Sequence, residues 1–433
     1  MSRRIVVRSG APLSGDVAVS GAKNSVLKCM AATLLAPGRH VISNVAAIED
    51  VTVMGDVLSA MGVVVDRSGL ESESSLVLDV PTDCQPEAPY ELAERIRASI
   101  VVLGPLLARF GRAKVPMPGG DDFGSRPIDM HIKGLEALGA DIVVRHGDLD
   151  ARADRLRGGR INLDYPSVGA TENLLMASVL AKGTTVLDNA AREPEIGDLV
   201  DLLTAMGARI DGKDTSTLTI EGVDDLHPTE HVVIPDRVEA ATYATAVGLA
   251  EGGITIRGAR LEHMDMLAEK LGEMGVHMSS VDGGAEGSGI WVTSEGRPRA
   301  ADVSTLPYPG IATDYKPFLL TLLTVSDGVA IVTENVYGAN RYAYVAELVR
   351  MGADIRTQGH HAVVRGVPRL SGAPIRAHDI RAGAALVLAG LAADGTTVVH
   401  DAHHVERGYA DLVASLRALG ADVGWEEVPS GKG

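Results

Sequence analysis

Apolar residues recur along this chain at helical spacing, and the predicted helices end in a common way. Leu199, Leu202 and Leu203 share one face of a predicted helix that stops at Met206-Gly207. Gly207 can take the left-handed conformation that ends a helix, and an apolar run typical of a strand follows it. A similar pattern, a glycine after Met or Leu and then a short run that contains a branched apolar residue, occurs six times, at Gly62, Gly139, Gly207, Gly275, Gly352 and Gly420.

The six glycines divide the chain into two groups of three, because their spacings are 77, 68, 68, 77 and 68 residues. A second glycine series alternates with the first, and each of its members precedes a short strand-like run: Gly38, Gly111, Gly183, Gly253, Gly328 and Gly395. A period of about 70 residues is too long for a solenoid repeat and suits a small αβ unit. The pattern therefore predicts one αβ unit repeated six times.

Local signals at the N-terminal end predict two strands and a helix. Residues 5–7 and 17–19 are expected to be strands joined by a turn around residues 12–15. Helix signals begin at Ser20 and stop at Pro37-Gly38.

Two glycine-rich segments are predicted to lie outside regular helices and strands. Residues 116–127 contain Gly119, Gly120 and Gly124 and are predicted to form a mobile loop. Residues 279–296 are rich in Gly and Ser and are predicted to form a surface hairpin. The main boundary between the halves is expected near residues 233–236.

Composition limits the partners and the cellular location that we expect for this protein. The 433 residues are 45% apolar and carry a net charge of −17, which argues against nucleic acid or an anionic membrane as a partner. Cys29 and Cys84 are the only cysteines, so we expect no disulfide framework and a cytoplasmic location. We expect no signal peptide and no transmembrane helix, because the N-terminus lacks an apolar core and no run of 18 uncharged apolar residues occurs.

Basic residues at junctions between loops and helices are candidate anion ligands. Lys23 lies in the first turn of a predicted helix, where a cation opposes the helix dipole unless an anion binds there. A solvated lysine is the alternative. Arg126, Arg341, Arg381 and Arg407 recur at similar junctions, although each alone is more typical of a surface arginine.

Three acidic residues are candidates for proton transfer. Asp121 and Asp122 lie between glycines in the predicted loop, where they are either solvated or carried by a lid that delivers a proton on closing. Asp314 is a separate candidate base. The pairs His360-His361 and His403-His404 lack metal-ligand spacing, so we predict no metal site. The sequence contains neither a Walker loop nor a dinucleotide fingerprint, and we predict no cofactor.

Seven motifs, in order along the chain, resemble those of the UDP-N-acetylglucosamine 1-carboxyvinyltransferase family, the enolpyruvyl transferases that start peptidoglycan synthesis. The shikimate-pathway enolpyruvyl transferases are similar more weakly, through the six-repeat architecture. The motifs are Ser20-Gly21-Ala22-Lys23-Asn24, Arg97-Ala98-Ser99, Pro118-Gly119-Gly120 with Gly124-Ser125-Arg126-Pro127-Ile128-Asp129-Met130-His131, Ser167-Val168-Gly169-Ala170-Thr171-Glu172, Asn189-Ala190-Ala191-Arg192-Glu193-Pro194-Glu195, Thr313-Asp314 and Arg407-Gly408-Tyr409.

The resemblance implies an α/β fold, a two-domain inside-out α/β barrel of six βαβαββ repeats with three in each domain. The first domain would be residues 21–235 with the mobile loop 116–127. The second would be residues 1–20 and 236–433, because the N-terminal strand returns to it. Substrates would bind between the domains, which close on the first substrate.

The resemblance also implies site residues. Lys23, Arg126 and Arg407 would hold the phosphate of phosphoenolpyruvate, and Arg341 and Arg381 its carboxylate, with Arg97 close by. Asp121 would be the catalytic acid and Asp314 the catalytic base, with Glu334 as the alternative base. The UDP-sugar would contact Asn24, Arg126, Pro127, Ile128, Asp129, Met130, His131, Ser167, Val168, Gly169, Asp314 and Val336.

Three positions depart from the family pattern. Asp121 replaces the usual loop cysteine, which predicts insensitivity to fosfomycin. Gly338 and an apparent inserted residue replace the usual acid before Arg341, and Lys316 replaces the Gln of Thr-Asp-x-Gln. The last two leave open another uridine nucleotide, such as UMP, as the acceptor. A catalytically weak UDP-sugar-binding paralogue is the third hypothesis.

Overall fold

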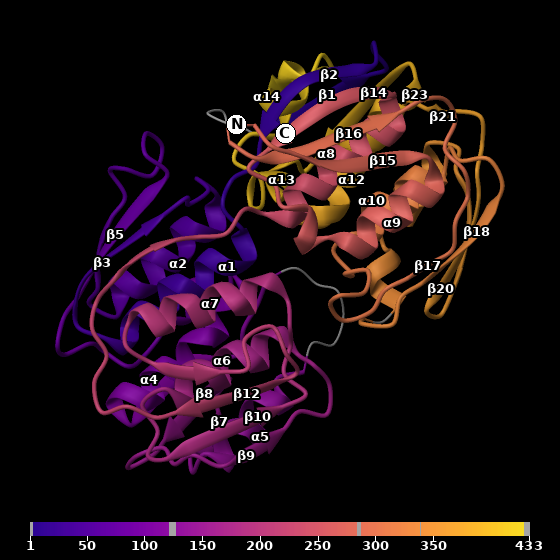
Figure 1. Cartoon of the computed structure of the whole chain (residues 1–433). Helices are drawn as coiled ribbons and strands as arrows, with labels where there is room; N and C mark the ends of the chain where they lie inside the picture. Colours follow the sequence, from indigo (N-terminus) through magenta and orange to yellow (C-terminus); the bar gives the residue numbers. More distant parts are fainter. Residues whose placement is uncertain (1–2, 121–126, 284–286, 338, 428–433) are drawn as a thin grey trace. The chain divides into compact units, whose positions relative to one another are not determined.

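The computed structural model describes residues 3–120, 127–283, 287–337 and 339–427 (Figure 1). These residues form two compact units. The 21–234 unit contains residues 21–120 and 127–234, and the 235–427 unit contains residues 3–20 together with the described residues from 235 onward. Each unit has a hydrophobic core of its own.

The 21–234 unit holds three sheets, with strand orders β13-β3-β5-β4, β6-β8-β7 and β11-β12-β10-β9. Its strands are β3 (Gly38–Ser43), β4 (Val64–Asp66), β5 (Ser75–Val80), β6 (Arg112–Pro116), β7 (Asp141–Arg145), β8 (Asp148–Arg152), β9 (Arg160–Asn162), β10 (Thr184–Asp188), β11 (Arg209–Asp211), β12 (Thr217–Glu221) and β13 (Glu230–Val232). Its helices are α1 (Lys23–Ala32), η1 (Thr33–Leu35), α2 (Glu49–Ala60), α3 (Tyr90–Ala93), η2 (Arg97–Val102), α4 (Leu103–Phe110), α5 (Asp129–Ala137), α6 (Val168–Ser178) and α7 (Pro194–Ala205).

The 235–427 unit holds the sheets β15-β16-β14-β2, β17-β18-β20-β19 and β22-β24-β1-β25, and the short pair β21-β23. Its strands are β1 (Arg3–Arg8), β2 (Leu13–Ala18), β14 (Gly252–Arg257), β15 (Val276–Val281), β16 (Gly289–Ser294), β17 (Val303–Ser304), β18 (Val329–Thr333), β19 (Asp354–Gln358), β20 (His361–Arg365), β21 (Leu370–Ser371), β22 (Pro374–Arg376), β23 (Ala393–Asp394), β24 (Thr396–His400) and β25 (Asp422–Glu427). Its helices are α8 (Arg237–Ala250), η3 (Leu261–His263), α9 (Asp265–Met274), α10 (Lys316–Leu323), η5 (Ala339–Tyr342), α11 (Val345–Arg350), α12 (Ile380–Leu391), α13 (His403–Glu406) and α14 (Leu412–Ala418).

The sheets repeat one pattern. An edge strand pairs in parallel with a central strand, and that central strand pairs antiparallel with the next strand of the sheet. The edge pairs β13 with β3, β9 with β10, β2 with β14, β17 with β18 and β22 with β24 are all parallel. In the second sheet an isolated parallel bridge between Glu87 and Lys114 takes the place of the edge strand. This order confirms the predicted sixfold repeat.

The two N-terminal strands belong to different sheets. β1 pairs antiparallel with both β24 and β25, so the N-terminal strand does return to the second group of repeats. β2 pairs in parallel with β14. The turn predicted around residues 12–15 was wrong, because Leu13 already pairs with Gly252 and the connection between the strands is residues 9–12.

The glycines that end the predicted helices take the expected conformation. The φ angles of Gly62, Gly139, Gly207, Gly275, Gly352 and Gly420 are 101°, 94°, 105°, 94°, 91° and 97°. Glycine adopts such positive φ angles without the steric cost that a Cβ atom imposes. The predicted hairpin at residues 279–296 is also confirmed, because β15 and β16 pair antiparallel.

Three helices, α6, α10 and α12, are largely or wholly buried, whereas strand β20 keeps one face in solvent. Every residue of α12 is buried, as expected for a helix that is apolar all round. α10 is also buried throughout, and α6 is buried from Ala170 to Ser178. By contrast, β20 alternates exposed and buried residues. This arrangement of helices inside and sheets outside (Figure 1) agrees with the predicted inside-out α/β fold class.

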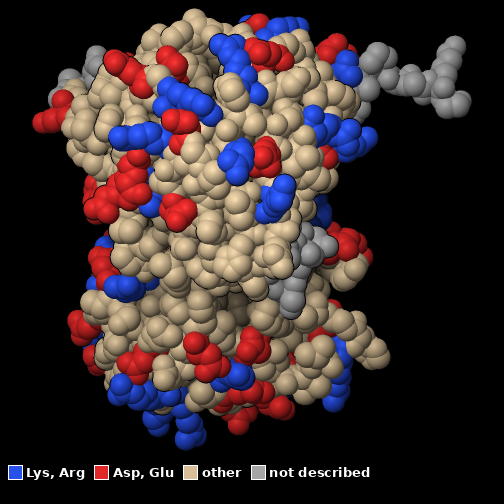
Figure 2. Space-filling model, turned by 90° about the vertical axis from the view of Figure 1, so that its right-hand side faces the viewer, with Lys and Arg blue, Asp and Glu red and all other residues tan. Residues whose placement is uncertain are grey.

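Acidic and basic side chains are interspersed on the face of the molecule shown in Figure 2. Exposed ion pairs among the described residues include Arg155 with Asp224 and Lys213 with Asp201. Among the residues that the structure describes, no helix combines the length and the apolar character that a membrane crossing requires.

Candidate active site

Lys23 is the first residue of α1, and it pairs with a buried acid. The residue before the helix, Ala22, provides no side-chain cap. The Lys23 Nζ atom lies 2.9 Å from Oδ2 of Asp50, and the two side chains are 13% and 5% exposed. Asp50 lies in the first turn of α2, where the helix dipole favours a negative charge. Lys23 is therefore a half-buried, oriented cation rather than a fully solvated one.

The first residues of the glycine-rich loop pack against the start of η2. The Nη1 atom of Arg97 donates to the carbonyl oxygen of Pro118 at 3.3 Å, and the Gly120 amide donates to the Glu94 carbonyl at 3.1 Å. A Cβ atom on Gly119 would lie 1.8 Å from the Glu94 carbonyl oxygen, so this approach requires glycine. The segment leading to the loop is therefore anchored on the residues around Arg97.

His131 and Gly169 meet at the start of α6. The Cε1 and Nε2 atoms of His131 would lie 3.4 Å from a Cβ atom on Gly169. Asn173 orients the ring: its Oδ1 accepts from the Gly104 amide at 2.6 Å, so its Nδ2 donates to His131 Nδ1 at 3.0 Å. Burial, followed by the charge of Arg97, lowers the pKa of His131 to about 4. The neutral ring thus carries its proton on Nε2, on the side of Gly169.

A buried acid of α6, Glu172, pairs with Lys28 of α1. Glu172 is 1% exposed, and its Oε1 lies 3.4 Å from Nζ of Lys28. The same Nζ atom donates to the carbonyl oxygen of Asn24 at 2.5 Å. Burial raises the pKa of Glu172 to about 7, with Lys28 opposing the shift and Glu195 and Glu193 adding to it.

We expect this acid to make the 21–234 unit less stable as the pH rises from about 4.5 to 7. The pKa of Glu172 is raised in the folded state, so over this interval the folded chain binds more protons than the unfolded chain. The contribution to the free energy of unfolding is at most about 3 kcal/mol. Urea unfolding gives the free energy of unfolding at pH 5 and at pH 8. This free energy should fall less between the two pH values for Glu172→Gln than for the wild type.

Glu136→Gln is the matched control, because Glu136 is an exposed acid on α5. Its unfolding should keep the pH dependence of the wild type. Parallel pH curves for Glu172→Gln and the wild type would contradict the raised pKa.

In the 235–427 unit, two buried arginines converge on Asp314. The Nη2 atom of Arg341 donates to Oδ1 of Asp314 at 2.9 Å, and Nε of Arg381 lies 3.8 Å from Oδ2. The arginine side chains are 2% and 5% exposed, whereas that of Asp314 is 28% exposed. The two guanidinium groups hold this carboxylate in place, and its remaining exposure leaves it open to a ligand.

Arg381 retains an unused donor for a ligand. It lies in the first turn of α12, where Asp379 caps the helix by accepting from the amides of Arg381 and Ala382 at 2.9 and 2.8 Å. Its Nη1 atom is buried and makes no hydrogen bond with any described residue. Burial disfavours its charge, but Tyr409, Asp236 and Asp314 outweigh burial and raise its pKa. A bound carboxylate could accept a hydrogen bond from this Nη1 group.

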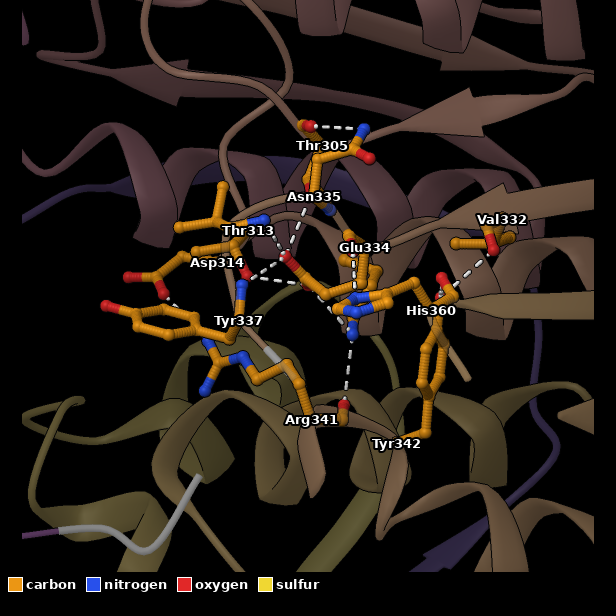
Figure 3. A network of polar contacts seen from close by, with 12 residues as sticks. Thr305, Thr313, Asp314, Val332, Glu334, Asn335, Tyr337, Arg341, Tyr342 and His360 are labelled. Carbon is orange, nitrogen blue, oxygen red and sulfur yellow. Dashed lines mark hydrogen bonds and ion pairs between the residues drawn. The ribbon is translucent and has the colours of Figure 1, made fainter. Parts of the chain in front are cut away.

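Glu334, the alternative base, is committed to other contacts. Its carboxylate is fully buried and accepts hydrogen bonds from Thr305, Thr313 and the amides of Val336 and Tyr337 (Figure 3). Lys316 completes the set with an ion pair. Burial opposes its charge, but Lys316 and the backbone donors outweigh burial and lower its pKa. These contacts leave Glu334 poorly suited to accept a proton.

Most of the remaining candidates lie at element boundaries. Three candidates, Asp121, Asp122 and Arg126, fall outside the described residues. Ile128 precedes α5, and Asp129 and Met130 begin it. Ser167 caps α6 by accepting from the Ala170 amide at 3.4 Å. Arg407 is a half-buried residue at the end of α13. Pro127 is the first described residue after Arg126, and Asn24 is a half-buried residue of α1.

One group of metal-ligand type occurs among the described residues, and it does not include the histidine pairs. Cys29, Asp198 and His231 place ligand atoms within 4.8 Å of one another. Both carboxylate oxygens of Asp198 already interact, Oδ1 with His231 Nε2 at 2.9 Å and Oδ2 with the Ser25 hydroxyl. The group ties β13 to α1 and α7.

Sequence reasoning missed the partners of several candidates. It did not find Asp50 beside Lys23, Asn173 beside His131, or Tyr409 beside Arg381. No local pattern identifies Asn173, which looks like an interior residue of an apolar helix. Asp50 could have been suspected only weakly from the sequence, because it is an acid in the first turn of a predicted helix.

This chain is similar to known proteins over nearly its full length. The model of the EPSP synthase (3-phosphoshikimate 1-carboxyvinyltransferase) family matches residues 7–416. The UDP-N-acetylglucosamine 1-carboxyvinyltransferase of Nocardia farcinica is 51% identical over 97% of this chain and 98% of its own length. The Corynebacterium jeikeium protein of the same name is 48% identical over 98% of this chain and 99% of its own.

A solved structure supports the same relationship. The enolpyruvyl transferase NikO from Streptomyces tendae is similar with a TM-score of 0.87 and 28% identity, over 99% of this chain and 100% of that chain. The match to the family model, the near full-length relatives and the fold lead to one conclusion: this chain belongs to the enolpyruvyl (1-carboxyvinyl) transferase family, as the motifs predicted.

Proposed function

We propose that this protein transfers the enolpyruvyl group of phosphoenolpyruvate to the 3-hydroxyl of UDP-N-acetylglucosamine, the first step of peptidoglycan precursor synthesis. The observation that carries the proposal is the near full-length identity of 48–51% with proteins named for that reaction. In the addition step the hydroxyl oxygen bonds to C2 of phosphoenolpyruvate and a proton adds to C3. In the elimination step C3 loses a proton and phosphate leaves.

Cationic side chains hold phosphoenolpyruvate in this proposal. Lys23, Arg126 and Arg407 take the phosphate, and Arg341 and Arg381 take the carboxylate, with Arg97 as a further cation. The oriented Lys23 and the unused Nη1 donor of Arg381 support these roles. A charge pair at 4 Å is worth about 4 kcal/mol at an effective dielectric constant of about 20. The net charge of −17 does not prevent binding, because salt screens distant charges beyond about 8 Å.

The acceptor is assigned to the starts of α1, α5 and α6 and to Asp314. Asn24, residues 126–130, Ser167, Val168, Gly169 and Val336 contact the nucleotide sugar, and Asp314 takes the proton of its hydroxyl. The neutral His131 beside Gly169 adds an N–H donor to this set. We also propose residues 21–235, and residues 1–20 with 236–433, as the two domains of a cytoplasmic enzyme that uses no metal or cofactor. The two free cysteines are consistent with that compartment.

Asp121 is proposed as the acid that protonates C3, and it should make the enzyme insensitive to fosfomycin. This epoxide alkylates a loop thiol, and a thiolate is a far better nucleophile than a carboxylate. Cys29 does not replace that thiol, because it is fully buried and burial raises its pKa well above the usual value. Wild-type activity should survive prolonged incubation with the drug, and Asp121→Cys should show time-dependent inactivation.

Intact-protein mass spectrometry checks this assignment. A fosfomycin adduct on the wild type, or an active Asp121→Cys variant that is never labelled, would show that Asp121 is not at the thiol position.

We retain a second acceptor class because of two departures from the family pattern, one of which, Gly338, lies outside the described residues. Lys316 and Gly338 differ from the family pattern, and Lys316 donates to the carbonyl oxygen of Arg341, the partner of Asp314. Another uridine nucleotide is therefore the second candidate acceptor. A phosphate-release assay with UDP-N-acetylglucosamine, UMP and 3-phosphoshikimate, followed by product mass, separates the two. Nucleotide binding without phosphate release from any acceptor would favour a catalytically weak paralogue.

A further inference from the structure

A fully buried ion pair lies beside the proposed base. The Nζ atom of Lys316 is 2.9 Å from Oε2 of Glu334, and both side chains are 0% exposed. Lys316 begins α10, and Glu334 follows β18. Removing two charges from water is costly, and the cost is offset only by close contact and additional hydrogen bonds. The surroundings of the pair supply such hydrogen bonds.

Glu334 joins two separate backbone segments. Its Oε1 atom accepts from the amides of Val336 and Tyr337 at 2.9 and 3.1 Å, which fixes the segment leading to Arg341. Its Oε2 atom accepts from the Thr313 hydroxyl at 2.9 Å, which fixes the residue before Asp314. One carboxylate thus holds the segments that carry Asp314 and Arg341.

Lys316 holds the second segment at its other end. Its Nζ atom donates to the carbonyl oxygen of Arg341 at 3.1 Å and lies 3.8 Å from the centre of the Tyr342 ring. Tyr342 is itself fixed, because its hydroxyl lies 2.9 and 3.1 Å from the carbonyl oxygens of Val332 and His360 and shares its one proton between them (Figure 3). The cation therefore contacts the backbone of the residue whose guanidinium binds Asp314.

We propose that Lys316 and Glu334 are a positioning pair that sets the placement of Asp314 against Arg341. Neither residue touches substrate in this assignment. The pair acts through Thr313 on one side and through the backbone of Arg341 on the other. The inference rests on the proposed function of Asp314, and it predicts that the pair controls turnover more than acceptor affinity.

Lys316→Met should lower kcat about 100-fold, because a displacement of about 1 Å at a reacting group has effects of that size. The KM for UDP-N-acetylglucosamine should change less than threefold. Lys316→Gln should recover most of the loss, because its amide can donate to both Glu334 and the Arg341 carbonyl. Lys270→Met is the matched control, since Lys270 pairs with the exposed Glu273 on α9, and it should keep the wild-type kcat.

A double-mutant cycle separates positioning from general damage. If the pair acts through Arg341, adding Lys316→Met to Arg341→Lys should lower kcat less than threefold further. If the kcat of the double variant is instead lowered by the product of the two single effects, the inference is overturned. Because Lys316→Met leaves a buried carboxylate without its cation, Lys316→Met/Glu334→Gln provides a neutral comparison. It should unfold at the wild-type temperature and still show a kcat at least tenfold lower.

Hydrogen exchange tests the contacts independently of turnover. The amides of Val336 and Tyr337 should exchange at least tenfold faster in Lys316→Met than in the wild type and in Lys270→Met. Unchanged exchange, or a wild-type kcat in Lys316→Met, would overturn the positioning role. The two proposals can fail separately. If the wild type released no phosphate with any acceptor, the proposed function would fail. Faster exchange of these amides in Lys316→Met would still support the contacts assigned to the pair.

Discussion

Asp314→Asn is expected to lower kcat by about 10³-fold or more while the variant still binds UDP-N-acetylglucosamine. General base catalysis contributes about 10²–10⁴-fold, and an amide cannot take the hydroxyl proton. Asp314 is 28% exposed, so it can reach a ligand while Arg341 and Arg381 hold its carboxylate in position. Steady-state phosphate release gives kcat, and calorimetry gives the dissociation constant of the acceptor.

Asp327→Asn is the control for that prediction. Asp327 is an 80% exposed acid in the same unit, paired with Arg297 at 3.6 Å, and its replacement should leave turnover unchanged. Normal turnover in Asp314→Asn would show that the base lies elsewhere. Glu334 would be a poor substitute, because its carboxylate already accepts from Thr305, Thr313, Lys316 and two amides.

Lys23→Ala is expected to lower kcat/KM more than 100-fold, about 3 kcal/mol of transition-state stabilisation. The phosphate gains charge as it leaves, and a preorganised cation stabilises that charge most strongly when little water is present. Lys23 is 13% exposed and is oriented by Asp50. Arg407→Ala should have an effect of similar size. Arg126→Lys should also be impaired, because an ammonium group cannot replace the bidentate guanidinium.

The stability of Lys23→Ala must be measured with its activity. Removing one partner of a buried ion pair costs about 3–5 kcal/mol, because the other charge remains buried. Lys23→Met/Asp50→Asn removes both charges and should recover much of the lost thermal stability but none of the lost activity. Wild-type kcat/KM in Lys23→Ala would exclude Lys23 from the phosphate site.

The candidate site was predictable from the sequence only in part. The motifs and their resemblance to a known family pointed to Lys23, Asp314, Arg341 and Arg381, and the structure brings the last three together. Lys316 was noted only as a departure from a pattern. Its role was invisible, because a lysine at the start of an apolar helix gives no sign of a buried acid 18 residues later.

The sequence by itself determined the repeating architecture. Helix periodicity and left-handed glycines act over a few residues, so Gly207 and its five equivalents mark helix ends whatever surrounds them. The apolar composition of α12 likewise required burial on every face. Tertiary structure alone decided which polar groups meet: Lys23 with Asp50, Asn173 with His131, and Lys316 with Glu334. A buried charge needs a partner, but the residue that supplies it depends on where distant segments come together, which no local pattern records.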